Sequence, residues 1–307
     1  MNEYLIELNN VTKEYNGKEC ISNLNMHIKK GRIYGILGKN GAGKTTTMKM
    51  MLNLIKPTSG EILIFGKEMK NNYKEILPRI GCLIESPGFY PNLTGTENLK
   101  IFAKLRGIPK KNSIKETLEI VGLPYNDKKL FSQYSMGMKQ RLAIGLAIMH
   151  DPEILILDEP INGLDPIGIV EIRRFIKKMC KDKGKTIIIS SHILSEIELI
   201  ADDIGIIDNG KLVKEESMED FTKSNKKYIS LFTLDEFKVV KILEEYFGIK
   251  NYSVGKRGNI KIYDLKISIS ELLRKFVKED IRIEEIYMKE DSLEDYFKKI
   301  TGGVDID

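Results

Sequence analysis

The chain has 307 residues, 42% of them hydrophobic and 30% charged, which is enough to bury the core of one large domain and a smaller one. Its 49 basic and 44 acidic residues give a net charge of only +5 and are interleaved along the sequence, so the composition argues against a nucleic-acid partner. It has no apolar run near the roughly 18 residues that span a bilayer, and its three cysteines and three histidines form no ligand-spaced cluster. We therefore expect a cytosolic chain without a structural metal.

The first part of the chain alternates strand and helix patterns around one glycine-rich loop. Residues 4–15 and 26–38 carry strand patterns, and the second of these leads directly into the loop. After the loop, residues 46–57 carry apolar positions at helical spacing and end at a proline. Five further short β-rich runs alternate with helical patterns, at residues 61–65, 80–85, 153–158, 186–191 and 203–208. This alternation predicts an α/β domain over residues 1–212 with a largely parallel core sheet.

One segment inside this domain breaks the alternation. Between Leu99 and Met149 the strand pattern is missing and several helical patterns follow one another. We therefore expect a helical subdomain inserted at about residues 88–142, leading into a helix that begins near Met138.

The chain changes character after the turn at Asn209 and Gly210, where it becomes rich in lysine and glutamate. Its patterns then follow the order strand, helix, strand, strand, helix, strand, and a last helix is expected over residues 292–300. That order predicts a small α+β domain of the ferredoxin-like kind over residues 213–307.

The glycine-rich loop reads GKNGAGKT from Gly38 to Thr45. Its glycines let backbone N–H groups turn inward around a phosphate, and the helix that opens after Lys44 directs its positive end at the same anion. We expect Lys44 to reach the β- and γ-phosphates of a nucleotide and the Thr45 hydroxyl to bind Mg²⁺. The other residues expected to contact the nucleotide are Gly38, Asn40, Gly41, Ala42, Gly43 and Thr46.

A second motif, ILILDEP at residues 154–160, places four apolar residues in a buried strand and two acids at its carboxyl end. Open parallel sheets bind their ligands at that end of the strands. We expect Asp158 to hold Mg²⁺ and Glu159 to orient or deprotonate the attacking water. One carboxylate for the metal and one for water is the division that hydrolysis requires.

A third motif, YSMGMKQR from Tyr134 to Arg141, lies between the other two and leads through a helix into the acidic strand end. Together the three motifs resemble the ATP-binding cassette family, the nucleotide-binding subunits of ABC transporters. The resemblance extends from about Val11 to Lys211. It implies an enzyme that hydrolyses ATP with Mg²⁺.

The resemblance also implies roles for individual residues of this chain. Tyr15 matches the aromatic residue that stacks on adenine, and Ser135 and Gly137 match the signature loop. Asp165, in INGLDP, matches the D-loop, and His192, after the strand at residues 186–191, matches the switch histidine.

The same resemblance implies an assembly in which two ATPase subunits pair head to tail. The signature loop of one subunit would cover the γ-phosphate held by the phosphate loop of the other, so that a helix N-terminus stabilises the phosphoryl charge in trans. A separate transmembrane permease would complete the transporter and hold the ATPase at the cytoplasmic face of the membrane.

Two departures from the family pattern point to a subset of it. The family usually carries a glutamine after the strand that leads into the helical subdomain, whereas this chain has Glu85 there. A glutamate keeps an oxygen ligand for the metal but loses the amide donor and adds charge. The signature loop contains Met136 and Met138 in place of a glycine and a glutamine. Both features resemble the bacitracin and lantibiotic export and self-protection subset, and Glu85 is expected to act in catalysis and as a metal ligand.

Other functions remain open from the sequence. The exported compound could be an unrelated hydrophobic molecule, and a regulatory ATPase without a transport role is the alternative. The chromosome-maintenance ATPases that share the signature are unlike this chain, because it lacks the sustained heptads of their long coiled coil.

Overall fold

The computed structural model describes residues 3–85, 87–108, 112–224, 227–255 and 258–302. The chain forms two compact units, Met1–Met218 with Ile300–Asp307, and Glu219–Lys299. The first unit therefore extends past residue 212, where we expected the boundary. The reason is strand β10 (Lys211–Ser217), which pairs antiparallel with β9 (Asp203–Asp208) and so belongs to the sheet of the first unit.

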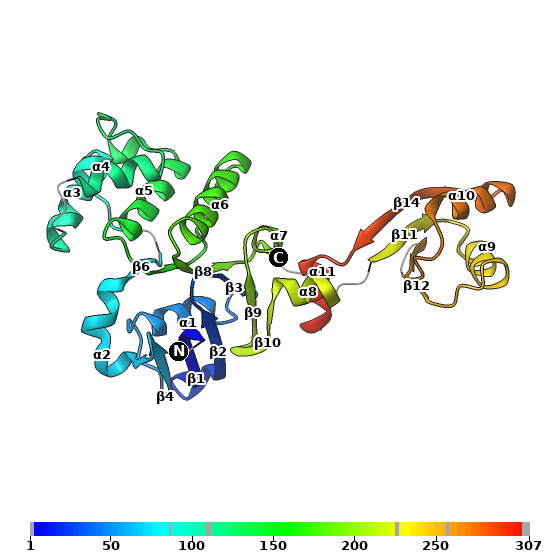
Figure 1. Cartoon of the computed structure of the whole chain (residues 1–307), viewed down its shortest axis with the longest axis horizontal. Coiled ribbons are helices and arrows are strands. Elements are labelled where there is room, and N and C mark those ends of the chain that lie inside the picture. The colour runs from blue at the N-terminus through cyan, green and yellow to red at the C-terminus, as the bar shows by residue number, and fades with distance from the viewer. Residues whose placement is uncertain (1–2, 86, 109–111, 225–226, 256–257, 303–307) are drawn as a thin grey trace. The chain divides into compact units, whose positions relative to one another are not determined.

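The centre of the first unit is a six-stranded sheet in the order β10-β9-β3-β8-β7-β6, in which all strands except β10 run parallel (Figure 1). Every residue of β3, β7 and β8 is buried, as expected for a parallel sheet covered on both faces. The remaining bounds in this sheet are Ile33–Leu37 for β3, Ile80–Leu83 for β6, Ile154–Leu157 for β7 and Thr186–Ser191 for β8.

A second, antiparallel sheet of the first unit has the order β2-β1-β4-β5. Its strands are β1 (Tyr4–Tyr15), β2 (Lys18–Lys29), β4 (Ser59–Ile64) and β5 (Lys67–Glu68). The prediction of one strand over residues 26–38 was wrong, because the chain turns at Gly31, where φ is +69°, and passes from this sheet into the parallel one. Helix α1 (Lys44–Met51) buries Met48, Met50 and Met51 in a core that both sheets share.

The helical part of the first unit begins with α2 (Met69–Ile76) and a 3₁₀ turn at Leu77–Arg79. The inserted helices are α3 (Gly95–Leu105), α4 (Ser113–Ile120) and α5 (Met136–Ile148), with a 3₁₀ turn at Phe131–Gln133 before α5. Helix α5 packs against α3, α4 and strand β6, and so ties the insertion to the parallel sheet. The unit also contains α6 (Pro166–Lys181) and α7 (Leu194–Glu198).

The second unit is built on an antiparallel sheet in the order β12-β13-β11-β14. The predicted order of strands and helices is confirmed, and with this sheet order it gives a ferredoxin-like module. Helices α9 and α10 supply Val239, Leu272 and Phe276 to its core. Two short helices, α8 and α11, lie side by side, with the rings of Phe221 and Tyr296 5.1 Å apart (Figure 1). The elements in chain order are α8 (Met218–Ser224), β11 (Lys227–Thr233), α9 (Glu236–Lys241) continued by a π-helical turn (Ile242–Tyr246), β12 (Tyr252–Val254), β13 (Asn259–Ile262), α10 (Ile269–Lys278), β14 (Ile283–Glu290) and α11 (Leu293–Ile300).

No helix within the described ranges combines the length and the apolar character needed to cross a membrane.

The order β3-β8-β7-β6 places four carboxyl strand ends next to one another. The phosphate loop follows β3, His192 follows β8, Asp158 follows β7, and Glu85 lies two residues beyond β6. Residues that are far apart in the sequence therefore meet at one edge of the parallel sheet.

Candidate active site

The loop from Gly38 to Gly43 joins the buried strand β3 to helix α1. Two of its glycines are required by space and conformation. A Cβ at Gly38 would lie 2.4 Å from the carbonyl oxygen of Ile207, and Gly43 has a φ of +112° and would place a Cβ 2.4 Å from Ile21 Cδ1. The loop therefore packs closely on the sheet and presents the first backbone N–H groups of α1 at the strand edge, which is the arrangement that binds phosphate.

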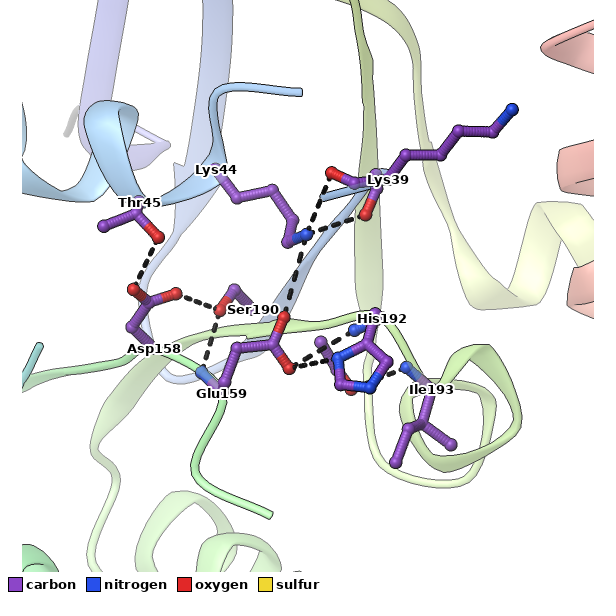
Figure 2. Close-up of polar contacts among 10 residues, drawn as sticks. Lys39, Lys44, Thr45, Asp158, Glu159, Ser190, His192 and Ile193 are labelled. Atoms are coloured by element: carbon purple, nitrogen blue, oxygen red, sulfur yellow. Dashed lines mark hydrogen bonds and ion pairs between the residues drawn. The ribbon is translucent and has the colours of Figure 1, made fainter. Parts of the chain in front are cut away.

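Lys44, the first residue of α1, is buried, and its ammonium group lies inside the loop. Its Nζ donates hydrogen bonds to the carbonyl oxygens of Gly38 at 2.7 Å and Lys39 at 3.2 Å, and lies 3.7 Å from Glu159 Oε1 (Figure 2). The positive charge is thus fixed at the centre of the loop, where a phosphate held by the loop would meet it.

Asp158 receives hydrogen bonds on both of its carboxylate oxygens (Figure 2). Thr45 Oγ1 donates to Oδ2 at 2.6 Å, and Ser190 Oγ donates to Oδ1. The Thr45 and Asp158 oxygens lie 2.6 Å apart, which is close to the separation of roughly 2.9 Å between two neighbouring ligands of one Mg²⁺. Both are of the hard oxygen type that Mg²⁺ prefers. This pair fits a magnesium ion.

Glu159 has a left-handed backbone conformation, with φ at +49°, which is uncommon for a residue with a side chain. Its N–H donates to Ser190 Oγ at 2.9 Å, and its Oε2 lies 2.8 Å from His192 Nδ1. The carboxylate is therefore held between His192 and the Lys44 ammonium. It is placed to accept a proton from a water molecule near the loop.

Glu85 lies outside this hydrogen-bonded cluster, although we expected it among the metal ligands. Its Oε1 accepts a hydrogen bond from Lys49 Nζ at 2.7 Å, and its side chain is 72% exposed. The hydrogen bond from the Lys49 ammonium lowers the pKa of the Glu85 carboxyl below its usual value. The structure thus connects Glu85 to helix α1, through a residue four positions after Thr45.

Tyr15 and Thr46 are two further residues expected to contact the nucleotide, and they lie at the end of β1 and in the first turn of α1. The Tyr15 ring, at the end of β1, is about half exposed, and Lys13 Nζ lies 4.8 Å from its centroid. The Thr46 hydroxyl accepts a weak hydrogen bond from Cys20 Sγ at 3.8 Å. A half-exposed aromatic ring is compatible with stacking on a base.

Ser135, Gly137 and Asp165 form a second group, away from the phosphate cluster. Ser135 caps α5 by accepting the Met138 N–H at 3.3 Å, and Asp165 caps α6 by accepting the Gly168 N–H at 2.9 Å. All three line a surface hollow of about 620 Å³. The first turn of α5 contains no acidic residue that would offset the positive end of the helix from within that turn.

The structure therefore brings together five of the predicted residues, namely Lys44, Thr45, Asp158, Glu159 and His192. Ser135, Gly137 and Asp165 instead line a separate surface hollow.

Sequence reasoning missed Ser190, a member of the phosphate cluster, and Lys49, the partner of Glu85. Ser190 is fully buried and joins Asp158 to the backbone of Glu159. The signal was a pair of serines, Ser190 and Ser191, at the end of a strand with an apolar middle, but the role of Ser190 depends on β8 lying next to β7. Lys49 is one of many lysines and carries no local signal.

Comparison with known proteins agrees with this geometry. The protein-family model described as ABC transporter matches residues 21–162. The chain is 50% identical over 301 residues to the bacitracin transport ATP-binding protein BcrA of Enterococcus faecalis, covering 98% of this chain and 97% of the relative. It is 52% identical over 299 residues to the protein of the same name from Bacillus licheniformis, covering 97% and 98%. The lantibiotic transport ATP-binding protein SrtF of Streptococcus pyogenes is 43% identical over 215 residues, covering 70% and 92%.

Solved structures give the same result for the fold. A dimeric ATP-binding cassette in a post-hydrolysis state with ADP and Pi matches with a TM-score of 0.63 and 26% identity, over 69% of this chain and 98% of that one. The cbiO1 protein from Clostridium perfringens, described as part of an ABC transporter complex, matches with a TM-score of 0.65 and 25% identity, over 81% and 98%. The predicted resemblance and fold class are confirmed. The chain belongs to the ABC transporter family and is an ATP-hydrolysing cassette of that family.

Proposed function

We propose that this cassette drives the export of a peptide antibiotic of the bacitracin kind and so protects the cell that makes or meets it. The observation that supports this best is the extent of the matches. The two bacitracin transport relatives align with 98% and 97% of this chain, so the alignments include the ferredoxin-like unit at residues 219–299. The lantibiotic transport relative aligns with only 70% of the chain. A shared accessory unit favours bacitracin-like export over lantibiotic export.

For the chemistry, we propose that Glu159 is the general base and that His192 orients it. The contact of 2.8 Å between Glu159 Oε2 and His192 Nδ1 supports this assignment. Lys44 would exchange its carbonyl partners for the β- and γ-phosphate oxygens of ATP. The Tyr15 ring would stack on adenine.

We assign the Mg²⁺ ligands of the protein to Thr45 and Asp158. Their oxygens are close together and are of the type that the ion prefers. Thr45 and Asp158 would hold the ion near the bound phosphates, where it would supply positive charge against the charge that develops during phosphoryl transfer. Ser190 would keep Asp158 turned toward this position. Glu85 would approach the metal only after leaving Lys49.

The second half-site supports an assembly of two cassettes. Ser135, Gly137 and the N-terminal end of α5 would cover the γ-phosphate bound to a second chain, with Asp165 at the contact between the two. A solved relative of this fold is dimeric with ADP and Pi bound, which supports the same arrangement.

A separate transmembrane permease would carry the antibiotic and hold the cassette pair at the cytoplasmic face of the membrane. The relatives are named as ATP-binding proteins of transport systems, and one structural neighbour is described as part of a transporter complex. Residues 219–299 would serve as an accessory domain of the cassette.

Susceptibility assays test this proposal. The chain is expressed together with a permease of the transporter in a bacitracin-sensitive bacterium, and the inhibitory concentrations of bacitracin, a lantibiotic and an unrelated hydrophobic drug are measured. We expect resistance to bacitracin that disappears when the cassette carries Glu159→Gln. Resistance to the lantibiotic or the drug alone would overturn the substrate assignment, and equal resistance with the Gln variant would overturn the energy-coupling role.

A further inference from the structure

Helix α1 connects the phosphate loop to two neighbouring strand ends. Thr45 and Lys49 are four residues apart and therefore lie on the same face of the helix. Thr45 Oγ1 donates to Asp158 at the end of β7, and Lys49 Nζ donates to Glu85 beyond the end of β6. One helix face thus holds both chain segments that leave these strands.

The strand ends carry acids at adjacent positions. Strands β6 and β7 pair in parallel with Leu83 opposite Leu157, and the N–H of Asp158 donates to the Leu83 carbonyl oxygen at 2.8 Å. Glu85 follows two residues after Leu83 and has a φ of +63°, a conformation that persists when surrounding contacts hold it. Its contact with Lys49 is one such restraint.

The charges in this region need compensation. Asp158, Glu159 and Glu85 bring three carboxylates to the two strand ends, and ATP would add several negative charges. Lys44 lies 3.7 Å from Glu159, and Lys49 pairs with Glu85. The Lys49 pKa is raised, first by its hydrogen bond to Glu85, although burial opposes the shift, with smaller contributions from Asp158 and Tyr15. The main partner of the Lys49 ammonium is thus Glu85.

We propose that Lys49 is a positioning residue for ATP hydrolysis. Its ammonium group neutralises Glu85 and fixes the chain segment after β6 to the helix that carries Thr45, so a carboxylate can stand beside a bound polyphosphate without repelling it. The proposal rests on the proposed role of the cluster in ATP hydrolysis. A neutral amide at position 85 would not need the lysine, and this difference makes the proposal testable.

A double-mutant cycle with Lys49→Met, Glu85→Gln and the double variant tests it, using the full chain together with its membrane partner. With Lys49→Met, we expect KM for MgATP to rise about fivefold, the upper end for a partly exposed ion pair, with little change in kcat. Because Glu85→Gln removes the charge, adding Lys49→Met to it should raise KM by less than about twofold. Lys49→Arg, which keeps the charge, should behave like the unaltered protein.

A purely structural role for Lys49 predicts a different pattern. Lys49 lies in the last turn of α1 and stabilises the helix C-terminus by its charge, whatever residue stands at position 85. A loss that is equally large in the Glu85→Gln background, or no loss with Lys49→Met alone, would overturn the proposal. The Lys67 and Glu75 pair is a matched control, since it is another exposed ion pair of the first unit, and Lys67→Met should leave KM unchanged.

Failure of this proposal is distinguishable from failure of the proposed function. If Glu159→Gln hydrolyses ATP at the full rate, the assignment of the hydrolytic cluster is wrong, whatever the cycle gives. If that variant is inactive but Lys49 and Glu85 show no coupling in KM, only the positioning role is wrong.

Discussion

Replacing Ser190 with alanine would test how the two site carboxylates are held. Its hydroxyl donates to Asp158 Oδ1 and accepts the N–H of Glu159 at 2.9 Å, and the residue is fully buried in strand β8. One small side chain therefore contacts both the Asp158 carboxylate, the proposed metal ligand, and the backbone of Glu159, the proposed general base. Alanine removes these contacts and leaves the packing almost unchanged.

The expected size of the effect follows from these two contacts. A hydrogen bond to a charged group is worth about 1.5–3 kcal/mol, and a buried N–H without a partner costs about 1–3 kcal/mol. Relaxation of the cluster would recover part of this, so we expect the free energy of unfolding to fall by about 2 kcal/mol. Partners that orient metal ligands typically contribute about 10–100-fold in metal affinity or activity. The Mg²⁺ concentration for half-maximal hydrolysis should rise by that range.

The assay is ATP hydrolysis measured as a function of Mg²⁺ at saturating ATP, together with thermal unfolding of the same samples. Ser191→Ala is the matched control, because Ser191 is also buried in β8 but its hydroxyl accepts the Ile193 N–H at 3.0 Å, away from Asp158. We expect a loss of stability from Ser191→Ala without the shift in Mg²⁺ dependence.

Two results would refute this reasoning. The first is an unchanged Mg²⁺ dependence in the Ser190→Ala protein. The second is the same shift in both serine variants, which would mean that any loss of a hydroxyl in β8 disturbs the site.

Three further predictions concern hydrolysis, assembly and stability. Glu159→Gln should slow ATP hydrolysis by about 10²–10⁴-fold with ATP binding retained, as measured by turnover and nucleotide titration, and undiminished turnover would contradict the general-base role. Lys44→Ala and Ser135→Ala chains should each be inactive alone but regain partial ATPase activity when mixed, because one composite site of the mixed pair is then intact; no recovery would argue against sites shared between chains. Burial lowers the pKa of His150, so the unfolded chain binds more protons as pH falls below about 6.5. The contribution of neutral His150 to the free energy of unfolding is complete above that pH and is lost as pH falls through the folded-state pKa. The Tm of His150→Gln should therefore fall less between neutral and acidic pH than the Tm of the unaltered protein.

The sequence predicted those parts of the site that depend on short, contiguous patterns. The loop around Lys44 and the acids at Asp158 and Glu159 are each defined by one strand, one turn and the start of the next segment. Their meeting followed from the rule that parallel strands gather ligands at their carboxyl ends. The structure agrees with this for Thr45 and His192 as well.

Features that depend on strand order or on single side chains could not be predicted. The chain turns at Gly31 between two different sheets, and an apolar pattern that continues on both sides of the turn does not reveal this. Ser190 gains its role only because β8 lies between β3 and β7. The partner of Glu85 is a lysine on α1, which no local pattern distinguishes from the other lysines of the chain.

The separation of the signature residues from the phosphate loop within one chain has a genetic consequence. A site completed by a neighbouring copy makes activity rise more steeply than in proportion to the amount of protein, so low expression would give disproportionately weak protection. An inactive copy would also lower the activity of the normal copies, because a mixed pair would keep at most one complete site instead of two. With random pairing of equal amounts of normal and inactive chains, only about one pair in four would contain two normal copies.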